Sequence, residues 1–124
     1  MNGHKLLVDT NIILYLIDGN KKIGQILDGK EIYVSFITEL ELLSYPELDE
    51  EQEEVIKSLL SECKVIGFDE WIKVHAIETR KKNKLKLPDC IIVATSKYFN
   101  IPFLTADKRI LKTGLENILL FEEP

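Results

Sequence analysis

Short apolar segments alternate along the chain with longer stretches of helical spacing. The apolar segments, rich in β-branched residues and bounded by turn or helix-start residues, predict strands at 5–8, 32–35, 64–67, 102–104 and 118–121. The stretches between them predict helices at 12–17, 22–27, 49–63, 71–84, 88–99 and 107–112. In segment 49–63, for example, an apolar stripe opposes the acidic run at 49–54. The chain therefore reads as alternating strands and helices.

This alternation indicates the fold class. Strands joined through helices imply right-handed crossovers and a mostly parallel sheet covered on both faces. We therefore predict an α/β fold, a three-layer α/β/α sandwich around a roughly five-stranded sheet. The 124 residues contain no repeat and no linker, so we expect a single domain over residues 1–124.

Composition excludes several classes of protein. Hydrophobic residues make up 45% and charged residues 30%, which is ordinary for a soluble globular domain. The longest apolar run, 12–17, is far shorter than the roughly 18 residues that span a bilayer. The N-terminal residues lack the pattern of a secretion signal, and Cys63 and Cys90 are too few and too distant for a disulfide framework or a zinc site. We expect a cytoplasmic protein with reduced thiols.

The net charge of −5 is unevenly distributed. Residues 1–70 carry 6 Lys and Arg against 15 Asp and Glu, whereas residues 71–113 carry 10 against 3. A basic half is compatible with phosphate contact at one face. The candidates for contact with RNA phosphates are Arg80, Lys84, Lys86 and Lys108. The alternative is that the basic run 80–86 decorates a helix C-terminus and complements its dipole.

Carboxylates recur where predicted strands end or buried helices begin. Asp9 ends the first strand, Glu41 follows the second, Asp107 follows the fourth, and Asp89 opens the helix that leads into the fourth. Each has a purely structural interpretation. Thr38 and Glu41 have capping-box spacing, with Thr38 as the N-cap, and the three aspartates suit N-caps or first helical turns.

Taken together, the four carboxylates favour a cation site. Open α/β sheets place their sites at the carboxyl ends of strands, so we expect these side chains to converge. At separations of about 5–7 Å their mutual repulsion would sum to about 15 kcal/mol, which rivals the stability of a whole domain. An all-oxygen site suits Mg²⁺ or Mn²⁺, and the matching chemistry is metal-assisted hydrolysis of phosphodiesters. Asp9→Asn and Asp107→Asn should then leave metal-free stability unchanged or higher.

Four segments, 7–14, 35–42, 87–94 and 104–107, resemble in order the acidic motifs of PIN domains. The length and layout are similar to VapC-type toxins of toxin–antitoxin pairs. The resemblance implies a PIN-like nuclease domain, a Mg²⁺- or Mn²⁺-dependent endoribonuclease, and a homodimer silenced by an antitoxin.

Carried over to this sequence, the resemblance assigns catalysis and metal binding to four acids: Asp9, Glu41, Asp89 and Asp107. Asn11, Thr38 and Thr105 become polar supports for those acids or for a metal-bound water. Glu39 competes with Glu41 for the second acidic position, and the Thr-x-x-Glu spacing favours Glu41. Some relatives carry another acid just after the fourth motif, where this chain has Lys108 and Arg109, which leaves a second metal ion open.

Two other functions stay open. A PIN-like fold can persist as a binding module without turnover. An acidic-pocket phosphotransfer or phosphatase domain would need a second acid beside Asp9, where this chain has Thr10 and Asn11. We also expect a protein partner to contact the early helices, because segment 12–17 offers more apolar surface than one sheet face can cover.

Overall fold

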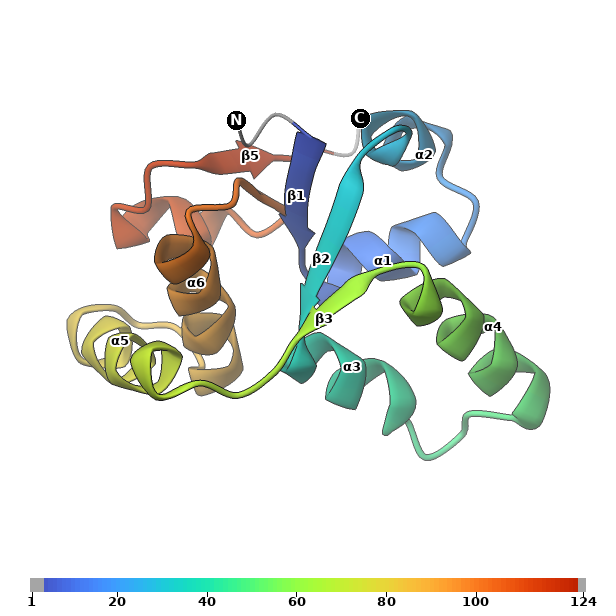
Figure 1. Ribbon diagram of the computed structural model, residues 1–124, viewed down its shortest axis with the longest axis horizontal. Helices are drawn as coiled ribbons and strands as arrows, with labels where there is room; N and C mark the ends of the chain where they lie inside the picture. The colour runs from blue at the N-terminus through green and yellow to red at the C-terminus, as the bar shows by residue number, and fades with distance from the viewer. Residues whose placement is uncertain (1–3, 123–124) are drawn as a thin grey trace.

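The computed structural model describes residues 4–122, and its centre is a five-stranded sheet (Figure 1). The strand order is β3-β2-β1-β4-β5, and every neighbouring pair runs parallel. The strands are β1 (Lys5–Val8), β2 (Glu31–Ser35), β3 (Lys64–Ile66), β4 (Phe103–Thr105) and β5 (Ile118–Leu120). The predicted parallel sheet is confirmed.

Helices cover both faces of the sheet, which confirms the three-layer α/β/α prediction. One side of the sheet carries α1 (Thr10–Ile17), α2 (Lys21–Leu27) and α4 (Glu50–Ser61), and α3 (Phe36–Leu43) lies below the carboxyl ends of the strands (Figure 1). The other side carries α5 (Glu70–Lys82), α6 (Leu87–Phe99) and the short 3₁₀ helix η2 (Lys108–Thr113). Helices α5 and α6 pack against each other as a pair.

Strand β1 separates two hydrophobic cores. Leu6 and Val8 join a core with α1, α2 and α4, whereas Leu7 points to the opposite core with α5 and α6. In β4, Leu104 faces the first core and Phe103 the second. Side chains alternate between the two faces of a strand, so both faces of a central strand are apolar when helices cover both.

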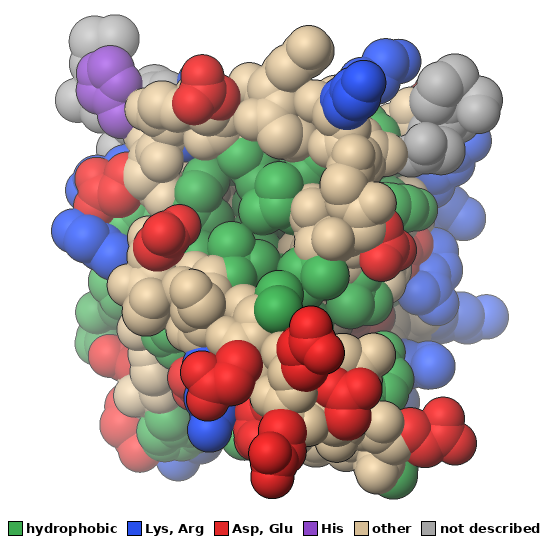
Figure 2. Space-filling model, turned by 90° about the vertical axis from the view of Figure 1, so that its right-hand side faces the viewer, with side chains coloured by type: hydrophobic (Ala, Val, Ile, Leu, Met, Phe, Trp, Pro, Cys, Tyr) green, Lys and Arg blue, Asp and Glu red, His purple; other side chains and the backbone are tan. Residues whose placement is uncertain are grey.

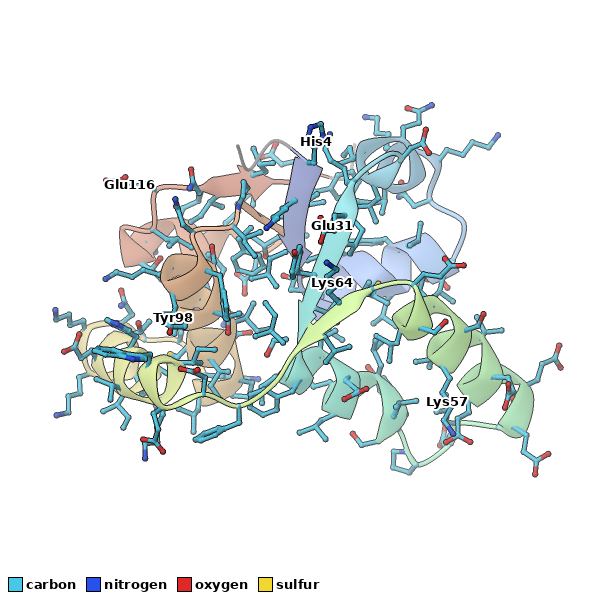
Figure 3. All side chains as sticks on the ribbon, in the orientation of Figure 1. His4, Glu31, Lys57, Lys64, Tyr98 and Glu116 are labelled. Atoms are coloured by element: carbon cyan, nitrogen blue, oxygen red, sulfur yellow. The ribbon has the colours of Figure 1, made fainter. Side chains whose placement is uncertain are left out.

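The β2–β3 edge adds a polar contact across the sheet. Glu31 on β2 forms an ion pair with Lys64 on β3 at 2.6 Å, and the two side chains meet in Figure 3. The ammonium groups of Lys64 and Lys5 lie 5.8 and 5.7 Å from the centre of the Tyr33 ring. These charged side chains stabilise the end of the sheet opposite the strand carboxyl ends.

The predicted strand at 102–104 begins one residue late, at Phe103. Pro102 has no N–H to donate to a neighbouring strand, although its carbonyl accepts from Leu7 N at 2.8 Å. Helix α4 begins after Asp49, whose side chain forms a capping box with Gln52. The remaining predicted helices lie within a few residues of α1, α2, α5, α6 and η2.

The prediction that Thr38 is an N-cap is wrong. Helix α3 begins at Phe36, and Ser35 is its N-cap, with Oγ accepting from Ile37 N at 3.1 Å. Because β2 runs directly into α3, the last residue of the strand serves as the cap. Thr38 is fully buried inside the first turns of α3.

Neither cysteine is paired: Cys63 is half-buried and Cys90 is buried, and both carry free thiols. No helix among residues 4–122 combines the length and the apolar character that crossing a bilayer requires.

Candidate active site

Four acidic residues belong to segments at the edge of the sheet where the parallel strands end, which is the lower edge in Figure 1. Asp9 follows β1, and Asp107 follows β4 and caps η2. Glu41 is carried by α3, which continues directly from β2, and Asp89 lies in the first turn of α6. The strand-end positions predicted from the sequence therefore share one edge.

Asp9 is held by backbone and side-chain donors. Its Oδ1 accepts from Ile12 N at 3.1 Å, which makes Asp9 the N-cap of α1, and its Oδ2 accepts the hydroxyl hydrogen of Thr105. Thr105 Oγ1 in turn accepts from Asp107 N at 3.0 Å. The buried Thr105 thus ties Asp9 to the turn that carries Asp107, across 96 residues of sequence.

Glu41 is tied to the same region by Thr10, a residue to which the sequence analysis gave no role. The Thr10 hydroxyl donates to Glu41 Oε1 at 2.6 Å and lies 3.2 Å from Thr38 Oγ1. Thr38, fully buried within α3, therefore supports the contact between α3 and α1 and is not a helix cap. The position of Thr10, directly after the strand-end acid, is the signal that could have identified it.

Burial and neighbouring charges set the proton affinities of Asp9 and Asp89. Removal from water raises the pKa of Asp9 from 3.8 to about 6, and the charges of Asp89 and Asp107 add to this. Hydrogen bonds from Thr105 and Ile12 act in the opposite direction. Burial also raises the pKa of Asp89, and the charges of Asp107 and Glu41 raise it further. The four acids therefore act on one another electrostatically.

Asp107 differs from the other acids because it has its own counterion. Arg109 Nη2 lies 2.6 Å from Asp107 Oδ2, and Arg109 Nε lies 3.0 Å from Asp107 Oδ1. This contact lowers the pKa of Asp107. The same Nη2 atom lies 4.0 Å from Asp89 Oδ2. Asp107 still repels Asp9 and Asp89, as expected, but Arg109 partly offsets its charge.

The type of donor in the cluster fits Mg²⁺ or Mn²⁺, because carboxylate oxygens are the ligands these ions prefer. Over residues 4–122, however, no three His, Cys, Asp or Glu side chains gather closely enough to hold one ion. Arg109 is a positive group already in contact with this set of oxygens, so it stands where a cation is chemically suited. The carboxylate oxygens are therefore the right type of ligand for a divalent ion, and in this structure Arg109 contacts two of the carboxylates.

The predicted phosphate contacts lie on the surface of the protein. Arg80, Lys84, Lys86 and Lys108 are all exposed. The charge of Lys86 lowers the pKa of Asp89, which places it beside the acidic cluster, whereas Arg80 acts on the buried thiol of Cys90. Asn11 is exposed in the first turn of α1. Glu39 is half-buried on α3, and it is Glu41, not Glu39, that accepts the hydrogen bond from Thr10.

Comparison with solved structures shows similarity to toxin–antitoxin proteins. A toxin–antitoxin complex from Klebsiella pneumoniae matches at 28% identity with a TM-score of 0.81, over 92% of this chain and 95% of that one. FitAcB from Neisseria gonorrhoeae matches at 22% identity and a TM-score of 0.78, over 92% and 96%. VapBC2 from Rickettsia felis, bound to a promoter DNA fragment, matches at 21% identity with a TM-score of 0.78, over 94% of this chain and 97% of that one.

A search of curated protein sequences gave no significant match. Among protein-family profiles, that of the PIN domain matches residues 6–115, which is most of the chain and includes all four acids. The resemblance seen in the four acidic segments is therefore confirmed: the chain belongs to the PIN domain family.

Proposed function

We propose that this protein is the toxin of a toxin–antitoxin pair, a Mg²⁺- or Mn²⁺-dependent endoribonuclease acting in the cytoplasm. The observation that carries the proposal is the meeting of Asp9, Glu41, Asp89 and Asp107 at one sheet edge, where burial and mutual charge raise the pKa of Asp9 and Asp89. Carboxylates in such a state favour a cation that neutralises them. The similarity to a toxin–antitoxin complex supports the biological role.

A bound divalent ion would lower the pKa of an attacking water and stabilise the leaving oxygen during phosphodiester hydrolysis. Asp9, Glu41, Asp89 and Asp107 would supply the oxygens that hold it. Thr105 keeps Asp9 and the Asp107 turn in place, and Thr10 and Thr38 keep Glu41 in place. These hydroxyls fix the carboxylates before any ion enters, which lowers the cost of assembling the site.

The surface around the acidic edge suits an RNA backbone. Lys84 and Lys86 lie between α5 and the first turn of α6, close to Asp89 in the chain, and Lys108 opens η2. Positive side chains beside an acidic site attract the phosphates that the carboxylates alone would repel. Replacing Lys84 and Lys86 with Gln should weaken RNA binding and reduce its salt dependence.

We further propose that an antitoxin covers the face formed by α1, α2 and α4. Figure 2 shows hydrophobic side chains in the middle of this face, with acidic side chains below and around them. Ile17 and Ile26 are each 36% exposed and Val55 is 48% exposed, whereas Ile12 and Ile13 are fully buried and belong to the core. The partner contact expected at the early helices stays a prediction, and within segment 12–17 Ile12 and Ile13 are not exposed for it.

The acidic border indicates what kind of partner segment fits this face. Glu51, Glu54 and Glu62 lie beside Val55 and Leu59 on an open surface along α4. An amphipathic segment with an apolar face and flanking Lys or Arg complements such a surface. The homodimer implied by the resemblance stays a prediction, which light scattering over a range of protein concentrations tests.

The decisive experiment is cleavage of total RNA by the purified protein with Mg²⁺, Mn²⁺ or EDTA. Asp9→Asn is the test variant, and Asp18→Asn, at an exposed carboxylate at the end of α1, is the matched control. We expect metal-dependent cutting by the wild type and Asp18→Asn only. Cutting in EDTA would contradict metal dependence, and cutting by Asp9→Asn would contradict the role of Asp9. Metal binding without cutting would favour the binding-module alternative.

A further inference from the structure

Arg109 holds Asp107 through both its backbone and its side chain. Besides the side-chain contacts of Nε and Nη2 with both carboxylate oxygens, the backbone N of Arg109 donates to Asp107 Oδ1 at 2.9 Å. The guanidinium therefore contacts the carboxylate from the side that opens to solvent, since 55% of the Arg109 side chain is exposed and only 21% of that of Asp107. Both oxygens that Asp107 could offer to an ion are engaged.

The same guanidinium also lies against a second acid of the cluster. Its Nη2 atom is 2.6 Å from Asp107 Oδ2 and 4.0 Å from Asp89 Oδ2, so one nitrogen lies between the two carboxylates. Its charge opposes the effect of burial on the pKa of Asp89. Arg109 would therefore compete with a divalent ion for these two carboxylates.

We propose that Arg109 is a built-in counter-cation of the acidic site, which leaves Asp107 when a divalent ion binds and then pairs with the RNA phosphate. This inference rests on the proposed function and concerns how its site is regulated. A guanidinium forms paired hydrogen bonds equally well with a carboxylate and with a phosphate. Because Arg109 is exposed and anchored at the start of η2, its side chain can change partner without any movement of the backbone.

This exchange of partners should affect metal affinity and RNA affinity in opposite directions. Without RNA, Arg109 opposes metal binding, because the ion must displace it from Asp107. With the ion in place, Arg109 favours RNA binding, because its charge is free at the mouth of the site. An arginine that only supports the fold of η2 would produce neither effect.

The test measures Mn²⁺ affinity and RNA affinity separately, without relying on cleavage. Mn²⁺ binding to the RNA-free protein is followed by calorimetry for the wild type, Arg109→Gln and Arg109→Lys. Lys112→Gln is the matched control, since it removes one positive charge at the other end of η2, away from the acids. We expect Arg109→Gln to bind Mn²⁺ about five- to tenfold more tightly, from loss of the competing pair and of a nearby positive charge. Lys112→Gln should change the affinity less than about twofold.

RNA binding is then measured by filter binding at saturating Mn²⁺ in the Asp9→Asn background, which prevents cleavage under the proposed function. Arg109→Gln should weaken RNA binding about fivefold, and Arg109→Lys should have an RNA affinity between those of Arg109→Gln and the protein with Arg109 intact. In an Asp107→Asn background, Arg109→Gln should tighten Mn²⁺ binding much less, because the pair with Asp107 is already broken and only the charge near Asp89 is removed.

The outcomes separate this inference from the proposed function. Equal Mn²⁺ affinity of the wild type and Arg109→Gln would overturn the role of Arg109 while leaving a metal-dependent nuclease intact. Weaker Mn²⁺ binding by Arg109→Gln would also overturn it, because Arg109 would then hold Asp107 in place for the ion. Failure of every variant to bind Mn²⁺ would refute the metal-dependent function itself.

Discussion

The raised pKa of Asp9 predicts that its replacement by Asn stabilises the metal-free protein. Burial of the ionised carboxylate is the largest cause of the increase from 3.8 to about 6. At about 1.4 kcal/mol per tenfold change in proton affinity, ionised Asp9 costs the folded state about 3 kcal/mol at pH 7.5. The asparagine of the variant carries no charge, and its Oδ1 can still accept from Ile12 N and cap α1.

Part of this gain is lost with the Thr105 hydrogen bond. Thr105 donates to Asp9 Oδ2, and an amide nitrogen at that position would force the hydroxyl to find another acceptor. Such a loss costs about 1 kcal/mol, which leaves a net gain of about 2 kcal/mol for Asp9→Asn. For a domain of this size we expect the Tm at pH 7.5 to rise by about 6–8 °C.

The pH dependence gives the sharper test. A carboxylate with a raised folded-state pKa imposes no penalty below its unfolded pKa of 3.8, and its full penalty above about 6. The penalty therefore decreases to about 1 kcal/mol at pH 4.5 and then balances the lost hydrogen bond. We expect the Tm difference between Asp9→Asn and the wild type to shrink from pH 7.5 to near zero at pH 4.5.

The assay is thermal unfolding by circular dichroism in EDTA, at five pH values between 4.5 and 7.5. Asp18→Asn, at an exposed carboxylate, is the control and should differ little from the wild type in Tm. A Tm for Asp9→Asn equal to or below that of the wild type at pH 7.5 would refute the reasoning. So would a stabilisation that does not change with pH, since the buried charge would then not be its cause.

Other predictions follow from single contacts. Asp107→Asn should lower the metal-free Tm by about 1–3 °C, because it breaks the pair with Arg109. A rise in Tm would show instead that repulsion among the acids outweighs this pair. Ser35→Ala should cost about 1 kcal/mol by removing the α3 cap, measured by urea unfolding. Phe103→Ala should cost about 3–5 kcal/mol in the same assay, since its side chain is 1% exposed. Iodoacetamide should modify Cys63 well before the buried Cys90, as mass spectrometry of timed samples would show.

The sequence predicts the layers and the sheet well because their signal is local. The continuous apolar run Leu6, Leu7 and Val8 of a strand buried on both faces, and the helical stripe around Ile56 and Leu60, are evident from the sequence alone. The start of α3 could not be predicted in this way, because the usual signal for a helix start is a capping residue that follows a turn. Here a strand passes directly into a helix, and the cap falls on Ser35.

The positions of the four acids at one sheet edge follow from the parallel topology, and so were predictable. The partners of each acid were not. Spacing along the chain does not reveal that the hydroxyl of Thr10 contacts Glu41 across 31 residues, or that Arg109 turns back onto Asp107. Such contacts depend on side-chain direction, which tertiary packing determines.

The position of β1 in the sheet has a consequence for synthesis of the protein. Strand β1 is made first but lies in the centre, between β2 and β4, and Asp9 at its end is fixed by Thr105. A nascent chain on the ribosome can pair β1 with β2 early, but the other edge of β1 stays unpaired until residues 103–105 have emerged. Because Thr105 and Asp107 arrive together with that last partner, the acidic edge assembles only late in translation. The growing polypeptide therefore lacks the complete acidic edge until the ribosome has made β4 and the turn that follows it.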